Sequence, residues 1–321
     1  MGEDHNRAAA PPGEGRGERW ALVLAGGDGA RLRPLTRELC GDDRPKQFCP
    51  VMGGRTLLEA TWARLDGVIT PPHRMAVVTR RHEPFYAPVM ARLRPAELVV
   101  QPDNRGTAPG ILYPLLKLAA RAPAAAVAVL PSDHHVSDDA RFMTWVEAAF
   151  EAAAARPDRL VLLGMIPDSP ESEYGWIEPG DLVSPAGPRD LYCVTRFWEK
   201  PPADLAQSLR RRGCLWNSFV MVGAVETFLA AIACALPALY GALDNVAPAF
   251  GGAVEAAAVR AAYAALPAAD FSRQVLTPST SRLAVLPVTG VAWSDLGSPD
   301  RVWRAWQQPS ALALAGAGTA A

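Results

Sequence analysis

The chain has 321 residues, of which 50% are hydrophobic and 20% charged, which is enough for one large α/β domain with a sizeable core. Its formal net charge of -1 gives neither the basic surface of a nucleic-acid-binding protein nor an acidic excess. The five cysteines are scattered without a C-x-x-C pair, which favours reduced thiols in a cytosolic protein over disulfides or a zinc site.

Both ends of the chain are expected to be disordered. Residues 1–18 are polar, charged and rich in Gly and Pro, without the apolar core of a signal peptide, and residues 309–321 are mostly small. No apolar run reaches the roughly 18–20 residues of a membrane span. We therefore place one folded domain at residues 19–308 and expect a cytoplasmic protein without a membrane partner.

Short apolar runs alternate with longer helical patterns through the first half of the domain. Strands are predicted at Trp20–Ala25, Met75–Thr79, Leu98–Gln101, Val127–Leu130 and Leu160–Gly164. Helices are predicted at Leu57–Asp66, Phe85–Leu93, Gly106–Ala120 and Asp139–Ala155. This alternation predicts an α/β fold with a mostly parallel central sheet and helices on both faces. Ligands of such sheets bind beyond the carboxyl ends of the strands.

The second half of the domain is more mixed. Strands are predicted within residues 174–180, 192–201, 215–223 and 282–288, and an Ala-rich helix at Val254–Leu266. The segment "WSDLGSPDRVWRAW", from Trp293 to Trp306, has the pattern of a loop that opens a helix.

The first predicted strand ends in a turn almost free of side chains, "AGGDGAR" at residues 25–31. A dinucleotide fingerprint fails because Leu32 stands at its third glycine, and no Gly-Lys-Ser/Thr Walker sequence follows. A purely structural turn is one alternative. Arg31 favours the other, a cradle for a nucleoside triphosphate, because its guanidinium is a fixed fork for phosphate oxygens.

Two more charged residues stand at informative places. Lys46 follows a proline that stiffens the backbone, and its compact charge suits a phosphate, although a solvated surface lysine is the plain alternative. Asp133 ends the fourth strand, in "VLPSDHH", where a carboxylate is a natural Mg²⁺ ligand. The alternative is a transition-metal cluster of Asp133, His134 and His135, but no further aspartate motifs of that kind are visible.

The stretch "LAGGDGARLRPLT" followed by "RPKQF" resembles the signature of sugar-1-phosphate nucleotidyltransferases. The Lys-Gln-Phe form, "TAP" at residues 107–109 and "PSDH" at residues 131–134 are similar to mannose-1-phosphate guanylyltransferases. The motifs follow in the family's order over roughly residues 20–306. The resemblance implies a Rossmann-like nucleotide-diphospho-sugar-transferase fold.

The resemblance also implies four groups of site residues. The nucleotide would be bound by Ala25, Gly26, Gly27, Gly29, Gln101, Arg105 and Thr107. The catalytic cations would be Arg31, Lys46 and Lys200. The sugar would be bound by Gly175, Glu199 and Asn217, and one Mg²⁺ by Asp133 and Asp295.

This sequence departs from the family pattern in two places. Asn104 and Gly106 stand in exchanged positions around Arg105, and Phe219 replaces the glycine of a Trp-Asn-Ser-Gly motif. The segment "DFSRQVL" (270–276) also has a counterpart in the family, but no chemistry is assigned to it.

The expected reaction joins a nucleoside triphosphate to a sugar 1-phosphate, with release of pyrophosphate. GTP and mannose 1-phosphate are the first choice, and another nucleotide or hexose is the alternative. A non-catalytic sugar-nucleotide-sensing paralogue is a further alternative. Neither nucleic acid nor a membrane is expected as a partner, and the chain is expected to be a monomer or a homodimer.

Overall fold

The computed structural model describes residues 18–186 and 189–307. The predicted tails, residues 1–18 and 309–321, lie outside the described residues except for Glu18. None of the helices within the described ranges is long and apolar enough to cross a membrane.

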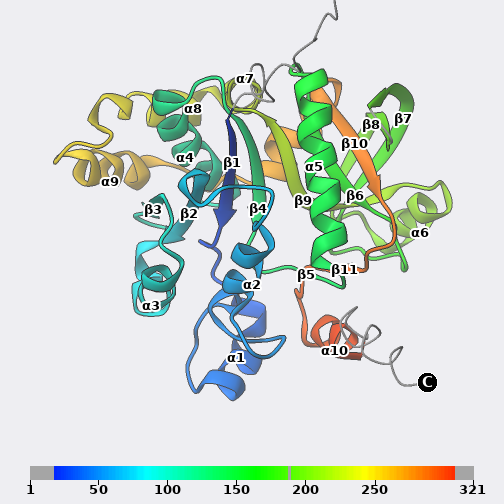
Figure 1. Cartoon of the computed structure of the whole chain (residues 1–321), viewed down its shortest axis with the longest axis horizontal. Helices are drawn as coiled ribbons and strands as arrows, with labels where there is room; N and C mark the ends of the chain where they lie inside the picture. Colours follow the sequence, from blue (N-terminus) through cyan, green and yellow to red (C-terminus); the bar gives the residue numbers. More distant parts are fainter. Residues whose placement is uncertain (1–17, 187–188, 308–321) are drawn as a thin grey trace, which may run out of the picture.

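A nine-stranded sheet forms the centre of the molecule (Figure 1). In spatial order its strands are β3 (Glu97–Gln101), β2 (Arg74–Thr79), β1 (Arg19–Leu24), β4 (Ala126–Pro131), β9 (Leu215–Ala224), β6 (Leu160–Met165), β10 (Leu283–Val288), β8 (Arg189–Glu199) and β7 (Gly175–Ala186). Only β9 and β8 of this sheet run opposite to the other strands. The predicted, mostly parallel α/β fold is confirmed.

Helices cover both faces of this sheet. One layer contains α2 (Leu57–Arg64), α3 (Glu83–Leu93), α5 (Asp139–Ala155) and α6 (Ala203–Arg211). The other contains α4 (Thr107–Arg121), α7 (Val225–Ala235), α8 (Pro237–Asp244) and α9 (Glu255–Ala265). Successive side chains of a strand point to opposite faces, so Ala21 and Val23 of β1 pack in the first layer and Trp20 and Leu22 in the second.

Local signals fix most of the predicted boundaries. The predicted helices agree with α2, α3, α4, α5 and α9 to within two residues at each end, and the first five predicted strands agree to within one. At the start of α2, Thr56 Oγ1 accepts from the Glu59 N–H (3.2 Å) and the Glu59 carboxylate accepts from the Thr56 N–H (2.9 Å), which is a capping box. Helix α1 (Arg33–Cys40), along with α6, α7 and α8, was not predicted from the sequence.

Two short strands bring distant loops to one edge of the sheet. β5 (His135–Val136), just after β4, pairs with β11 (Trp293–Ser294), just before the last helix, α10 (Pro299–Gln307). The loop after β4 and the loop after β11 therefore lie side by side. That edge carries the carboxyl ends of β1 and β4, where a ligand is expected.

Candidate active site

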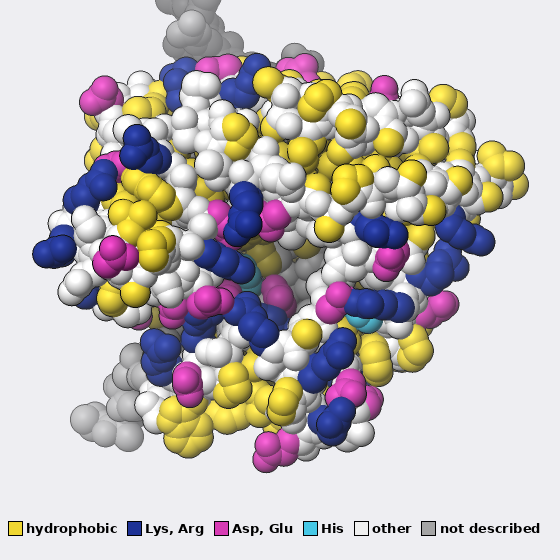
Figure 2. All heavy atoms as spheres, turned by 180° about the vertical axis from the view of Figure 1, so that it is seen from behind, with side chains coloured by type: hydrophobic (Ala, Val, Ile, Leu, Met, Phe, Trp, Pro, Cys, Tyr) yellow, Lys and Arg dark blue, Asp and Glu magenta, His cyan; other side chains and the backbone are white. Residues whose placement is uncertain are grey.

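A cleft of about 500 Å³ opens at this edge of the sheet. It corresponds to the hollow near the centre of Figure 2, which is ringed by basic and acidic side chains. Twelve of the fifteen predicted site residues line it. They are Gly26, Gly27, Gly29, Arg31, Lys46, Thr107, Asp133, Gly175, Glu199, Lys200, Asn217 and Asp295.

The other three predicted residues do not line the cleft. Gln101 is 4% exposed and packs against Gly26, where an added Cβ would come within 2.6 Å of its Nε2. Ala25 is buried at the end of β1, and the Arg105 guanidinium lies 3.4 Å from the Asp103 carboxylate. These residues shape the nucleotide loops, and their direct contact with a nucleotide stays a prediction.

Gln47, which has no predicted role, holds the glycine loop. Its buried amide donates to the carbonyl oxygens of Ala25 (3.0 Å) and Gly27 (2.7 Å). Gly29 adopts φ 57°, and a Cβ there would lie 3.1 Å from the backbone nitrogen of Lys46. The Lys-Gln-Phe motif therefore packs directly beneath the loop: its glutamine fixes the loop while its lysine lines the cleft.

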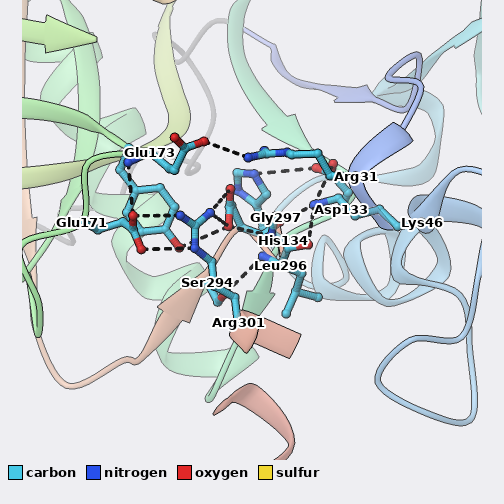
Figure 3. Close-up of polar contacts among 12 residues, drawn as sticks. Arg31, Lys46, Asp133, His134, Glu171, Glu173, Ser294, Leu296, Gly297 and Arg301 are labelled. Carbon is cyan, nitrogen blue, oxygen red and sulfur yellow. Dashed lines mark hydrogen bonds and ion pairs between the residues drawn. The ribbon is translucent and has the colours of Figure 1, made fainter. Parts of the chain in front are cut away.

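Lys46 is the more firmly held of the two cations at this end (Figure 3). Its side chain is 9% exposed and its Nζ lies 3.3 Å from Asp133 Oδ2. The same ammonium donates to the carbonyl oxygens of Asp295 and, at 3.2 Å, of Leu296. The ammonium is thus held by one carboxylate and two carbonyl oxygens, and an arriving phosphate would compete with Asp133 for its charge.

In the part of the chain that the structure describes, Arg31 is held by one exposed ion pair. Its Nη1 lies 3.0 Å from Glu173 Oε2, and the two side chains are 57% and 51% exposed. Glu173 belongs to the loop before β7, so the pair spans the cleft. Exposed pairs of this kind contribute little, so Arg31 is available to a stronger anion.

The Asp295 carboxylate is fixed by several donors. Its Oδ1 accepts from the Tyr174 hydroxyl (3.1 Å), the Gly297 N–H (2.8 Å) and Arg301 Nη1 (3.0 Å). Its Oδ2 accepts from Arg301 Nη1, at 3.1 Å, and from no other group among residues 18–186 and 189–307. Burial raises the pKa of this carboxyl, but the positive charges of Lys46 and Arg301 outweigh burial and hold the pKa below its usual value. Asp295 is therefore ionised.

Arg301 links α10 to this site. It is 6% exposed, and its Nη2 lies 3.0 Å from Glu171 Oε1. Its guanidinium stacks 4.4 Å from the centre of the Tyr174 ring. Sequence reasoning missed Arg301 and Glu171, because nothing local separates this arginine from a surface arginine of a helix.

Asp133 and Asp295 lie in one cleft because β5 pairs with β11. Burial lowers the pKa of His134, which is therefore neutral; its Nε2 lies 3.6 Å from Asp133 Oδ1 and its ring packs edge-on against Trp293. Within residues 18–186 and 189–307, no group of three or more His, Cys, Asp or Glu is arranged to hold a metal. The transition-metal cluster therefore has no support in the described part of the chain.

Gly175, Glu199 and Asn217 come together from three different strands. A Cβ at Gly175 would lie 3.0 Å from Glu199 Oε2 and 3.2 Å from Asn217 Cβ, so a larger residue there would have to displace these side chains by a few tenths of an ångström. Burial raises the pKa of Glu199 to about 7; the negative charge of Asp270 adds to this and Lys200 opposes it. This end of the cleft thus has a carboxyl group that titrates near neutrality.

Asp270 and Ser272 also line the cleft, although no chemistry was assigned to residues 270–276. The segment is tied to the start of α4 by the Phe271 N–H, which donates to Thr107 Oγ1 at 2.7 Å. The sequence did contain a signal, the short polar and aromatic stretch 270–276 ahead of β10. Its role could not be derived locally, because its partner Thr107 lies more than a hundred residues earlier in the chain.

A Rossmann-like α/β sheet, with a glycine loop, two cations and two aspartates in one cleft, is the arrangement expected of a nucleotidyltransferase. The chain belongs to the nucleotidyl transferase family, whose sequence model matches residues 20–310. The resemblance noted in the sequence is thereby confirmed at the level of the family.

Individual relatives give a finer comparison. A crystal structure from Thermus thermophilus, described as a mannose-1-phosphate geranyltransferase, is 32% identical with a TM-score of 0.78, covering 91% of this chain and 80% of that chain. Xanthan biosynthesis protein XanB of Xanthomonas campestris pv. campestris (strain B100) is 33% identical over 284 residues, 86% of this chain and 57% of that protein. Mannose-1-phosphate guanylyltransferase of Escherichia coli (strain K12) is 30% identical over 292 residues, 88% of this chain and 59% of that protein. The chain thus spans little more than half the length of these two curated relatives.

Proposed function

We propose that the chain is a sugar-1-phosphate nucleotidyltransferase, with GTP and mannose 1-phosphate as the first-choice substrates. The observation that carries this is the composition of one cleft. A glycine loop with two cations forms one end, a pocket of Gly175, Glu199 and Asn217 forms the other, and two aspartates stand with them. The names of the similar proteins favour the guanylyl group and mannose.

In the proposed reaction, an oxygen of the sugar phosphate attacks the α-phosphorus of the triphosphate in line. The new P–O bond forms as the bond to pyrophosphate breaks, and the pair of electrons leaves with pyrophosphate. No general base is needed because a sugar phosphate is already ionised at neutral pH. The protein contributes position and charge. Arg31, Lys46 and the glycine-loop amides would hold the triphosphate, and Lys200 would orient the attacking phosphate.

Mg²⁺ is the cofactor that we propose, and the donors of the cleft suit it. Mg²⁺ takes oxygen ligands, commonly one or two carboxylates completed by substrate phosphates and water. The Asp133 and Asp295 carboxylates both line the cleft, and among the described residues Asp295 Oδ2 accepts one hydrogen bond, from Arg301 Nη1, which leaves a lone pair for a cation. These two residues would hold the ion. When bound, it would neutralise charge on the reacting phosphates.

The test is pyrophosphate release by the purified protein with Mg²⁺, crossing the four common nucleoside triphosphates with mannose, glucose and galactose 1-phosphates. Release with GTP and mannose 1-phosphate alone is the expected result. Release with another pair would keep the reaction and change the substrates. No release from a folded protein would overturn catalysis and favour the sensing paralogue, although Lys46, Asp133 and Asp295, which such a paralogue is expected to lose, are present.

A further inference from the structure

Backbone strain gathers around the cleft. Among the described residues, four other than glycine have a left-handed backbone, and three of them line the cleft: Lys200 (φ 51°), Phe219 (φ 59°) and Leu296 (φ 49°). The fourth, Arg94 (φ 47°), ends α3 and is not part of the wall. For a bulky aromatic residue this conformation is unfavourable, because its Cβ crowds the backbone. Such strain persists where the surrounding structure enforces it, often at functional sites.

Phe219 lies in an irregular part of β9. The pairing of β6 with β9 shifts register between Leu162 and Gly164, where β9 accommodates extra residues. Ser218 closes this bulge: its buried hydroxyl donates to the Leu163 carbonyl oxygen at 2.7 Å. Bulges beside active sites re-aim side chains, and here Phe219 lines the cleft as Asn217 does.

The strained backbone serves the sugar end in two separable ways. The Phe219 N–H donates to Asn217 Oδ1 at 3.1 Å, which orients the amide of a predicted sugar-binding residue. A glycine at position 219 would make the same bond without strain. The backbone bond therefore does not explain the phenyl ring, which needs a reason of its own.

Phe219 lines the cleft and is also packed, half-buried, against the hydrophobic core of the second layer. It packs edge-on against Phe271, 6.3 Å away between centroids, and the Phe271 N–H is bound to Thr107. Two other aromatic side chains, Tyr174 and Trp293, line the cleft. Their rings pack edge-on against each other, and the Arg301 guanidinium covers the Tyr174 ring. The rings of Tyr174 and Trp293 are thus occupied by each other and by Arg301, whereas Phe219 is half-buried and lines the cleft. Of the three rings, Phe219 is therefore the one that we consider for contact with a ligand.

We propose that Phe219 binds the sugar, its ring forming the apolar wall against which the hexose of the substrate packs. This rests on the proposed function. A hexose presents hydroxyl groups at its edge and C–H groups on its faces. Glu199, Lys200 and Asn217 supply polar partners for the edge, and an aromatic ring suits a face of C–H groups.

The test compares the affinities for GDP and for GDP-mannose, because the difference between the two binding free energies reports the contribution of the hexose. Wild type is measured by calorimetry beside Phe219→Gly, which keeps the backbone bond and removes the ring, and Phe219→Tyr, which keeps the ring. Arg94→Gly is the matched control, since it relieves the same kind of strain outside the cleft. Thermal unfolding of each variant is recorded in parallel.

Phe219→Gly is expected to weaken GDP-mannose binding about fivefold to tenfold, the size of one aromatic contact, and GDP binding less than twofold. Phe219→Tyr and Arg94→Gly should bind both ligands within about twofold of wild type. Phe219→Gly should unfold within about 3 °C of wild type, because relief of strain offsets lost packing.

Four results would overturn the inference. Equal weakening of GDP and GDP-mannose would place the ring at the nucleotide. Unchanged binding of both, or a wild type that does not distinguish the two ligands, would leave no hexose wall. A large fall in unfolding temperature with both affinities reduced would make Phe219 structural. Binding as expected in a protein that releases no pyrophosphate would instead refute the proposed catalysis and keep this inference.

Discussion

The two ends of the cleft are built from different structural elements. The nucleotide end consists of loops at the carboxyl ends of the parallel strands β1 and β4, and its charged groups for a ligand are Arg31 and Lys46. The sugar end is assembled from the antiparallel strands β7, β8 and β9, and it adds the carboxyl groups of Glu199 and Asp270. One end thus suits phosphates and the other hydroxyl groups, which matches a substrate pair joined through a phosphate.

The largest effect is expected at the aspartates between the ends. Asp133→Asn removes the charge that would hold Mg²⁺, so kcat should fall at least about 100-fold while the KM for each substrate changes much less. Steady-state pyrophosphate release at saturating Mg²⁺ measures this. Asp158→Asn is the control, since Asp158 is an exposed carboxylate paired with Arg156 and lies outside the cleft. A rate within fivefold of wild type would exclude Asp133 as the metal ligand.

Separate losses of substrate affinity would sharpen the contrast between the ends. Lys200→Ala should raise the KM for the sugar 1-phosphate about tenfold or more, the value of a charge-assisted hydrogen bond, and leave the nucleotide KM within about twofold. Arg31→Ala should do the reverse. Arg210→Ala, which removes an exposed cation from α6, should change neither KM. An exchanged pattern would show that the two ends have been assigned the wrong way round.

The same contrast explains what the sequence could predict. The glycine loop and Asp133 directly follow buried strands, and Lys46 lies a short distance along the chain from the glycine loop. Short local sequence patterns were therefore enough to predict them. The fold class followed from the alternation of strands and helices. Buried apolar runs have no direction, however, and the antiparallel place of β9 between β4 and β6 could not be derived from its residues.

The sugar end was reached only through the family resemblance, since its members have no shared local pattern. Asp270 and Arg301 were missed because their significance depends on partners far away in the chain, Glu199 for one and Glu171 for the other. Gln47 was missed because a glutamine that holds a loop through carbonyl oxygens leaves no periodic signal. Contacts of this kind exist only once the fold has formed.

A smaller effect is expected in the pH dependence of the sugar end. The raised pKa of Glu199, about 7, means that its protonated form persists up to neutral pH, and the ionised form accepts stronger hydrogen bonds from hydroxyl groups, at both of its oxygens. The kcat/KM for the sugar 1-phosphate should therefore rise through pH 7. In Asp270→Asn burial still raises the pKa of Glu199, but the negative charge that adds to the rise is gone, so the midpoint should move to lower pH.

The pH profiles need a baseline, because the phosphate of the substrate itself titrates near pH 6 in every variant. Glu199→Gln supplies it: the step near pH 7 should vanish and the substrate's own titration should remain. A midpoint that stays in place in Asp270→Asn would show that the two carboxyl groups do not interact, and a step that survives in Glu199→Gln would belong to another group.

The smallest effect concerns the ion pair of Arg31 with Glu173, which spans the cleft. Glu173→Gln frees Arg31 for the triphosphate, and because the pair is exposed, the nucleotide KM should fall only about twofold at low salt. The difference should vanish near 0.5 M NaCl, where exposed charges are screened over about 4 Å. Glu226→Gln, an exposed carboxylate on α7, removes the same charge elsewhere. If it lowers the KM equally, the effect is one of net charge, and Glu173 does not compete with the nucleotide for Arg31.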